Sequence, residues 1–235
     1  MSSTLLPKTI INALEQRQRA FLWTGEEKCH GASCLIAWER VCQEKEHGGL
    51  GFRSLHTQNH RLLLKFVHKL LTPSALSWQA WFSRNHPGAL GETTPDTYLA
   101  RIVCEELPRY RELTSVRVGN GETTSFWHNR WLLDTCLAIA LPALYSHCTR
   151  PHALVCSVLS TGLADHLRPR LTRQASEEKQ VLHDCLTTIT LTNSPDARWM
   201  YAAPDRPFST SEIPRSTRID PTPNIDAIRI WQTNL

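Results

Sequence analysis

The chain has 235 residues, and its 26 Lys and Arg side chains outnumber its 22 Asp and Glu side chains by four. Hydrophobic residues make up 41% and charged residues 20%, a composition that is typical of globular proteins and excludes disordered or collagen-like chains. The longest apolar stretch, Cys136–Tyr145, contains Pro142 and is too short for a membrane-spanning helix of about 20 residues. Only two leucines precede Pro7, so no signal-peptide core is recognised.

The excess positive charge lies in the first third of the chain. Residues 1–70 hold 10 basic and 6 acidic side chains, whereas residues 71–235 hold 16 of each. Such an excess permits a polyanion partner, but it also describes an ordinary solvated surface. The eight cysteines are scattered, which favours a reducing, intracellular compartment over a disulfide framework.

Helical periodicity is clear in this first third. Apolar residues recur at helical spacing over 9–23 and again over 55–71, where Leu62, Phe66 and Val67 belong to a broad stripe. Both segments are therefore predicted to be amphipathic helices. Between them, the run from Gly48 to Gly51 needs the backbone angles that glycine permits.

The middle of the chain predicts two more helices and a hairpin. One helix covers 74–82, and another begins at Thr94 as N-cap and stops at Leu107, because Pro108 has no backbone N–H. The Asn-Gly dipeptide at 120–121 lies between two extended runs, which is the pattern of a β-hairpin near 116–127.

The last third gives weaker signals. Ser176 followed by two glutamates predicts a capped helix through Ile189. Residues 203–224 contain five prolines and are expected to be loop or disordered. We therefore predict a mainly α fold with one or two short β-hairpins and a partly disordered, Pro-rich tail, divided into 1–84, 85–192 and 193–235.

Four ordered blocks together cover nearly the whole chain. They are Phe21–Gly25 with Ala37–Cys42; Gly48–Phe52 with Gln58–Asn59 and Leu62–Phe66; Val118–Gly121 with Thr124–Trp127 and Arg130–Trp131; and Phe208–Ser211 with Ile230–Trp231. In this order they resemble the C-terminal part of reverse transcriptases from plant non-LTR retrotransposons. No single block is specific, but the ordered set is.

The resemblance implies an assignment for each segment. Residues 1–84 would correspond to a thumb-like or connecting helical region, downstream of the polymerase palm and fingers. Residues 193–235 would be the truncated start of the reverse-transcriptase zinc-binding domain, ending before its Cys/His cluster. Pro214 departs from the family pattern, because a proline there breaks the first turn of the helix that the family tends to have.

The sequence does not predict an enzyme. Nucleotidyl transfer needs carboxylates that hold two metal ions about 4 Å apart, and these polymerases present them partly as an Asp-Asp pair. This sequence contains no Asp-Asp pair. Its Glu-Glu pairs at 26–27, 105–106 and 177–178 are attributed to loop or helical contexts, the last two to solvated helix faces.

Metal binding has one weak set of candidates, which are Cys29, Cys34, Cys42 and His47. Zinc sites favour two cysteines separated by two to four residues with a second pair further along, and here both pairs are separated by four residues. Buried thiols beside Trp38 are the favoured interpretation, so no zinc and no other cofactor is expected.

Nucleic-acid contact is the functional hypothesis with physical support. Arg61, Lys65 and Lys69 recur every four residues on one predicted helix and could follow a row of phosphates. A second set combines Arg117 and Arg130 with the ring of Trp127, which could stack on single-stranded bases. The alternative is that the cations are solvated and the tryptophan belongs to the core.

These observations lead to one main hypothesis and two alternatives. The main one is a non-catalytic fragment of a retrotransposon polyprotein that binds RNA or DNA weakly and without sequence preference, with the remainder of the polyprotein as a partner and the nucleus as the place of action. The alternatives are a degenerate open reading frame without function and a small zinc-dependent interaction module.

Overall fold

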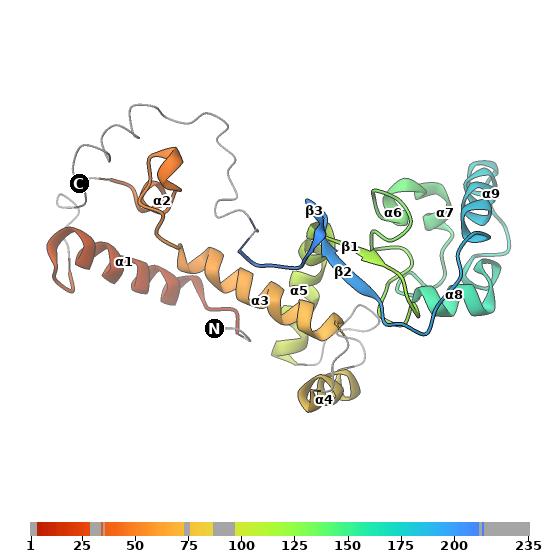
Figure 1. Ribbon diagram of the computed structural model, residues 1–235, viewed down its shortest axis with the longest axis horizontal. Helices are drawn as coiled ribbons and strands as arrows, with labels where there is room; N and C mark the ends of the chain where they lie inside the picture. Colours follow the sequence, from red (N-terminus) through yellow and green to blue (C-terminus); the bar gives the residue numbers. More distant parts are fainter. Residues whose placement is uncertain are drawn as a thin grey trace. The chain divides into compact units, whose positions relative to one another are not determined.

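A computed structural model describes residues 4–28, 34, 36–72, 76–86, 97–211 and 213. Over these residues the protein is mainly α-helical with one small antiparallel sheet (Figure 1), which confirms the predicted fold class. The expectation that residues 203–224 are loop or disordered is wrong for Ala203–Pro207, which form a strand because they pair with a neighbouring one. The residues from 214 onward and the predicted N-cap Thr94 lie outside the described residues.

The chain forms two compact units, which are described separately. The first unit consists of Met1–Lys65 with Thr210–Leu235, and the second of Phe66–Ser209. These units are defined by contacts within the fold. The predicted domains 1–84, 85–192 and 193–235 are based on composition and on the family resemblance. Those three ranges therefore stay predictions.

The first unit is built from helices. Its elements are α1 (Lys8–Thr24), α2 (Trp38–Val41), the 3₁₀ turn η2 (Lys45–His47) and the first part of α3 (Leu55–Leu71). The helices predicted over 9–23 and 55–71 are thus confirmed. Gly48 and Gly51 have φ angles of +82° and +71°, as the glycine run between these helices requires.

Buried polar contacts fix the entry to α3. The Glu15 carboxylate of α1 accepts the N–H of Leu55 at 2.9 Å and the hydroxyl of Ser54 at 3.1 Å, a favourable place for an anion because the first N–H groups of a helix lack partners. Asn59, fully buried, accepts the N–H of Leu6 and donates to the carbonyl of Thr4, both at 2.9 Å. The N-terminal segment is thereby attached to α3.

In the second unit, helices precede the first strand of the sheet and separate the first strand from the other two along the chain. After the end of α3, its elements are α4 (Ser77–Asn85), α5 (Tyr98–Leu113), β1 (Thr114–Arg117), α6 (Leu137–Ala140), α7 (Pro142–Ser146), α8 (Val155–Thr161), the 3₁₀ turn η4 (Leu163–His166), α9 (Arg173–Leu186), β2 (Ala197–Met200) and β3 (Ala203–Pro207). Among the described residues, no helix combines the length and apolarity that crossing a membrane requires.

Helix α5 corrects the prediction of a stop before Pro108. The helix continues through this proline to Leu113, although a proline inside a helix costs a backbone hydrogen bond. Leu107 and Tyr110 on either side are 3% and 0% exposed, and the Tyr110 carbonyl accepts the hydroxyl of Thr114 at 2.8 Å. Tertiary burial therefore outweighs the local cost of the proline.

The sheet has the order β1-β2-β3 and pairs segments that are distant in sequence. Strand β1 runs antiparallel to β2, with Ser115 opposite Trp199 and Arg117 opposite Ala197. The hairpin predicted near 116–127 is not formed, and the short hairpin of this fold is β2–β3 instead. Asn120–Gly121 does form a turn, but the chain after it bridges Leu154 through Ser125.

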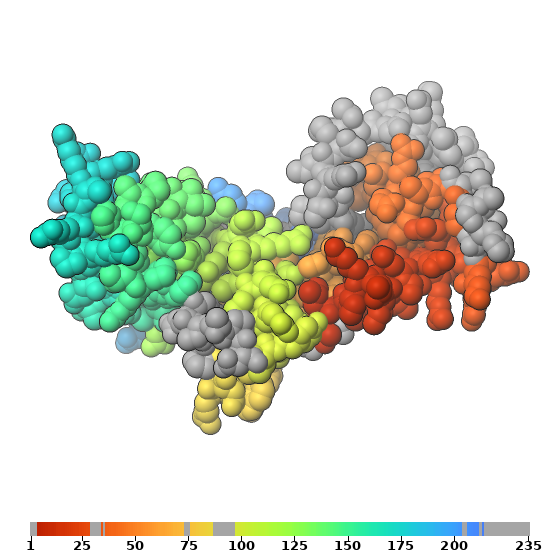
Figure 2. All heavy atoms as spheres, turned by 180° about the vertical axis from the view of Figure 1, so that it is seen from behind, coloured from red at the N-terminus to blue at the C-terminus, as the bar shows by residue number. Residues whose placement is uncertain are grey.

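The core of the second unit lies among α6 to α9 and the segment after β1, which form one continuous green and cyan body in Figure 2. Its fully or nearly fully buried members are Phe126, Trp127, Leu137, Leu144, Val155, Val158, Leu163, Leu167, Ala175 and Leu182. These side chains come from a long stretch of short elements, so the core depends on tertiary packing rather than on any one helix.

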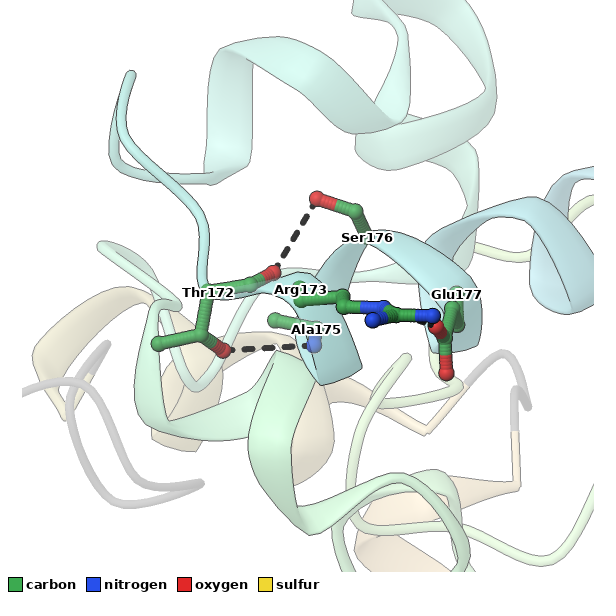
Figure 3. A network of polar contacts seen from close by, with 5 residues as sticks. All are labelled: Thr172, Arg173, Ala175, Ser176 and Glu177. Carbon is green, nitrogen blue, oxygen red and sulfur yellow. Dashed lines mark hydrogen bonds and ion pairs between the residues drawn. The ribbon is translucent and has the colours of Figure 1, made fainter.

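The N-cap of α9 lies four residues before the predicted cap. Figure 3 shows the hydroxyl oxygen of Thr172 accepting the N–H of Ala175 at 3.3 Å, while Ser176 donates to the Thr172 carbonyl at 3.1 Å. Arg173 and Glu177 form an exposed ion pair at 3.0 Å. Threonine is thus the N-cap, and Ser176 lies inside the first turn.

Candidate nucleic-acid interface

One buried carboxylate organises the loop after β1. Oδ1 of Asp196 accepts the N–H groups of Gly119 at 2.8 Å and of Gly121 at 2.9 Å. Its Oδ2 accepts the hydroxyls of Thr124 at 2.7 Å and Thr123 at 2.9 Å, and the N–H of Thr123 at 3.1 Å. The N–H groups of both glycines are therefore committed to Asp196, as expected for a structural turn and not for a phosphate-binding loop.

The two glycines of this loop are required by space and by backbone angle. A Cβ at Gly119 would lie 2.1 Å from the carbonyl oxygen of Ser194. Gly121 has a φ of +71°, and a Cβ there would lie 2.8 Å from the nitrogen of Cys156. Since L-residues rarely adopt this angle, the loop accepts only glycine at these positions.

The charge of Asp196 is stabilised inside the protein. Burial raises its pKa, but the hydrogen bonds from Thr124, Gly119, Gly121 and Thr123 together bring the pKa below its ordinary value. Two residues further on, Arg198 is also buried and donates to the Thr123 carbonyl. Burial lowers the pKa of Arg198, and Tyr110 and Asp196 oppose that effect.

Strand β2 alternates between a buried and an open face. Arg198 and Met200 are 6% and 3% exposed, whereas Trp199 is half-buried and Tyr201 is 46% exposed. The N–H of Tyr201 donates to the carbonyl of Leu113 at 2.9 Å, which extends the β1–β2 ladder by one pair. Trp199 therefore lies on the open face of β2, and Tyr201, in the turn directly after β2, is exposed as well.

Each of these two rings carries an arginine. The guanidinium carbon of Arg117 lies 5.7 Å from the ring centroid of Trp199, and that of Arg130 lies 4.2 Å from the ring centroid of Tyr201. Arg130 is placed by its bridge to Ser115 and donates to the carbonyl of Glu112. We call these four residues, Arg117, Arg130, Trp199 and Tyr201, the outer sheet face.

The residues predicted for nucleic-acid contact separate into exposed and buried groups. Trp127 is 0% exposed and packs in the core, so its ring has no open face for a base. Arg61 is 7% exposed and donates to the carbonyl of Ile213 within the first unit. Lys65 and Lys69 are exposed on α3, and a two-residue cationic pair replaces the predicted three-residue stripe.

Trp199 and Tyr201 were missed by sequence reasoning. The available signal was weak, because Arg198 is followed by three apolar or aromatic residues, Trp199, Met200 and Tyr201, without a polar–apolar alternation. It was overlooked because the segment is short and its partner strand lies about eighty residues earlier, as the pairing of Ser115 with Trp199 shows. Sequence reasoning singled out Trp127 instead, because it belongs to the Thr124–Trp127 block, but this ring lies in the core.

The Glu-Glu pairs are more structural than the sequence suggested. Glu178 accepts the N–H of Leu144 at 2.7 Å and so holds the first turn of α7. Glu106 is 6% exposed within α5, while its neighbour Glu105 is exposed. The interpretation as solvated helix faces is therefore wrong for Glu178 and Glu106, because tertiary contacts bury or recruit these carboxylates.

The weak zinc candidates are not gathered in the described part of the chain. Cys29 lies outside it, and Cys34 is disulfide-bonded, whereas zinc takes a thiolate. Burial, with Glu15 and Glu39, raises the pKa of Cys42 to about 11, although Arg19 opposes this. His47 is exposed. No group of three His, Cys, Asp or Glu side chains that could hold a metal ion occurs among the described residues.

Two partly buried histidines have strongly shifted pKa values. Burial and the nearby charge of Arg198 lower the pKa of His68 to about 4, and its Nδ1 lies 2.7 Å from the hydroxyl oxygen of Tyr110. Burial, Arg111 and His152 lower the pKa of His128 to about 4. Both rings are neutral at pH 7, so neither adds positive charge toward a polyanion.

Comparison with known proteins gives two relatives from Arabidopsis thaliana. The "Putative ribonuclease H protein At1g65750" is 31% identical over 147 residues, which cover 56% of this chain and 22% of that protein. The "Uncharacterized mitochondrial protein AtMg00310" is 31% identical over 144 residues, which cover 57% of this chain and 90% of that protein.

No protein-family model matches the chain, and no solved structure matches it. The chain spans about a fifth of the first relative but nearly the whole of the second. It therefore belongs to the same family as the Arabidopsis mitochondrial protein AtMg00310.

Proposed function

We propose that the chain is a fragment of a plant non-LTR retrotransposon reverse-transcriptase polyprotein, with no polymerase chemistry of its own. Two observations support this proposal, the ordered sequence blocks and the similarity to a plant protein whose name includes ribonuclease H. Within it, residues 1–84 correspond to a thumb-like region and residues 193–235 to the start of the reverse-transcriptase zinc-binding domain. The rest of the polyprotein is then its natural partner, and the nucleus its place of action.

The activity that we propose for this fragment is weak, sequence-independent binding of RNA or DNA. The observation that carries it is the pair of arginines stacked on aromatic rings at an open sheet face. Exposed Lys65 and Lys69 on α3 add cations. Phosphate contacts of this kind release counterions and are independent of sequence, and aromatic rings accept any base.

A salt series tests the binding. The purified chain is titrated onto labelled single-stranded RNA, and the same titration is made with Lys65→Ala/Lys69→Ala. We expect micromolar binding that weakens with salt, and a slope of log K against log salt that is smaller by about 1 to 1.5 in the variant, since each phosphate contact on a single strand contributes about 0.7.

The matched control is Arg168→Ala/Arg170→Ala, which removes the same charge from exposed positions in the loop before α9. This variant is expected to retain the slope of the unmodified chain. Absence of binding at low salt would overturn the proposed activity. An equal loss in both variants would reduce it to a general effect of net charge.

The absence of catalysis needs its own test. The sequence lacks an Asp-Asp pair, and two-metal nucleotidyl transfer depends on clustered carboxylates. We expect no primer extension and no cleavage of an RNA–DNA hybrid with Mg²⁺ or Mn²⁺, measured on labelled substrates. Turnover that co-purifies with the chain and survives high-salt washing would contradict the proposal.

The two alternatives make different predictions. A degenerate product would melt over a broad range, whereas the buried core and the Asp196 contacts favour a cooperative transition. A zinc-dependent module would purify with one equivalent of zinc and lose structure in a chelator. Calorimetry and metal analysis of the same preparation separate these cases from the proposed fragment.

A further inference from the structure

We propose that the outer sheet face is where single-stranded nucleic acid binds, with bases stacked on Trp199 and Tyr201 and phosphates held by Arg117 and Arg130. This inference rests on the proposed binding activity and assigns it to a place. It replaces Trp127, which is buried, by two rings that the sequence did not single out.

The geometry of the face favours a ligand that carries alternating rings and negative charges. Ser115 lies opposite Trp199, and the diagonal neighbour Arg117 places its guanidinium over the indole ring. On the other side of β1, Arg130 is bridged to Ser115 and lies over the ring of Tyr201. Each guanidinium is thus held next to a ring. A nucleotide can therefore place its phosphate against the guanidinium and its base against the ring.

The spacing of the rings favours a single strand over a duplex. Tyr201 follows Trp199 by two residues, in the turn directly after β2, and two extended residues span about 6.8 Å at a rise of about 3.4 Å per residue. Bases in a duplex follow one another at about 3.4 Å per strand. Two consecutive bases can therefore each occupy a ring only if the nucleic-acid backbone is extended and the bases are unstacked from one another.

The position of the face in the fold supports a rigid platform. The side chains beneath it are Arg198 and Met200, both buried, and β2 begins directly after Asp196, whose carboxylate fixes the loop after β1. The end of β1 and the start of β2 are thereby fixed before any ligand binds. A preorganised surface loses less conformational entropy on binding than a flexible one.

The test compares variants on two oligonucleotides of equal length, oligo(dT) and the same backbone without bases. We expect Tyr201→Ala to weaken oligo(dT) binding about tenfold at every salt concentration without changing the salt slope, because a stacked base contributes about 1 to 3 kcal/mol. Tyr201→Phe, which keeps the ring, should restore the affinity. Arg117→Ala should lower the slope by about 0.7.

The abasic oligonucleotide separates stacking from charge. Tyr201→Ala should bind it as the unmodified chain does, and a tenfold loss there would overturn the stacking assignment. Oligo(dT) binding with a normal salt slope that none of these variants changes would leave the proposed activity intact and refute this location. Preferred binding of a duplex over oligo(dT) would refute the single-strand assignment. Circular dichroism of each variant verifies that its fold is kept.

Discussion

The two units of this protein are stabilised in different ways. The second unit has a continuous apolar core, and its main polar contact, Asp196, lies at the edge of that core with five hydrogen bonds to one loop. The first unit also buries apolar side chains, among them Trp38 and Leu63, and adds the polar contacts that Glu15 and Asn59 make at and near the start of α3. Its α1 leaves Phe21 74% exposed and Ile10 48% exposed. We therefore expect the second unit to contribute most of the free energy of unfolding.

Replacement of core Trp127 should have the largest effect. Trp127→Ala removes a fully buried ring from the second unit, and such changes cost about 3 to 5 kcal/mol. Phe21→Ala in the first unit removes an exposed ring and should change the free energy of unfolding by less than about 0.5 kcal/mol. Urea denaturation followed by circular dichroism measures the free energy of unfolding of both variants. Similar losses in the two variants would contradict the expected difference between the two units.

Loss of the Asp196 carboxylate should come next. Asp196→Ala leaves the N–H groups of Gly119 and Gly121 and two hydroxyls without their acceptor, and a buried unsatisfied group costs about 1 to 3 kcal/mol. We expect a destabilisation of about 3 kcal/mol, measured by urea denaturation. Asp196→Asn retains one carbonyl acceptor and should lose less. A near-neutral Asp196→Ala would show that the loop finds other partners.

A smaller effect is expected at the polar contacts of the first unit. Asn59→Ala removes the acceptor for Leu6 and the donor to Thr4, and should cost about 1 to 2 kcal/mol. Hydrogen exchange should show faster exchange at the N-terminus of α1 and little change in the second unit. Equal acceleration in both units would mean that they do not unfold independently.

The last prediction is a pH dependence carried by the second unit. The pKa values of His68 and His128 are lowered to about 4, mainly by burial, against about 6.5 in the unfolded chain. The unfolded state therefore takes up these protons first, so their stability contribution is complete above pH 6.5 and is lost as the pH falls toward 4. Urea midpoints at several pH values should show this.

The variants His68→Gln and His128→Gln sharpen that prediction. Each removes one of the two titrating groups, so the dependence of the midpoint on pH between 6.5 and 4 should become shallower with each variant and shallowest in the double variant. A slope that the double variant leaves unchanged would assign the pH dependence to other titrating groups.

The sequence by itself determined the elements whose signal is local. The apolar stripe over 55–71 predicted α3 at its observed bounds, and 9–23 predicted α1 within one residue at each end. At Asn120–Gly121 the chain does bend, and glycine at position 121 has the expected positive φ, although the predicted hairpin is not formed. These features follow from helical periodicity and from backbone sterics, both of which act over a few residues.

Only the tertiary structure decided where distant segments meet. Strand β1 pairs with Ala197–Met200 rather than with the run after the turn, because Asp196 takes the N–H groups of the turn that a hairpin would have oriented toward the other strand. Burial likewise carried α5 through Pro108 and placed Trp127 in the core. The candidate site depends on these long-range contacts, so local sequence patterns located its arginines but not its aromatic rings.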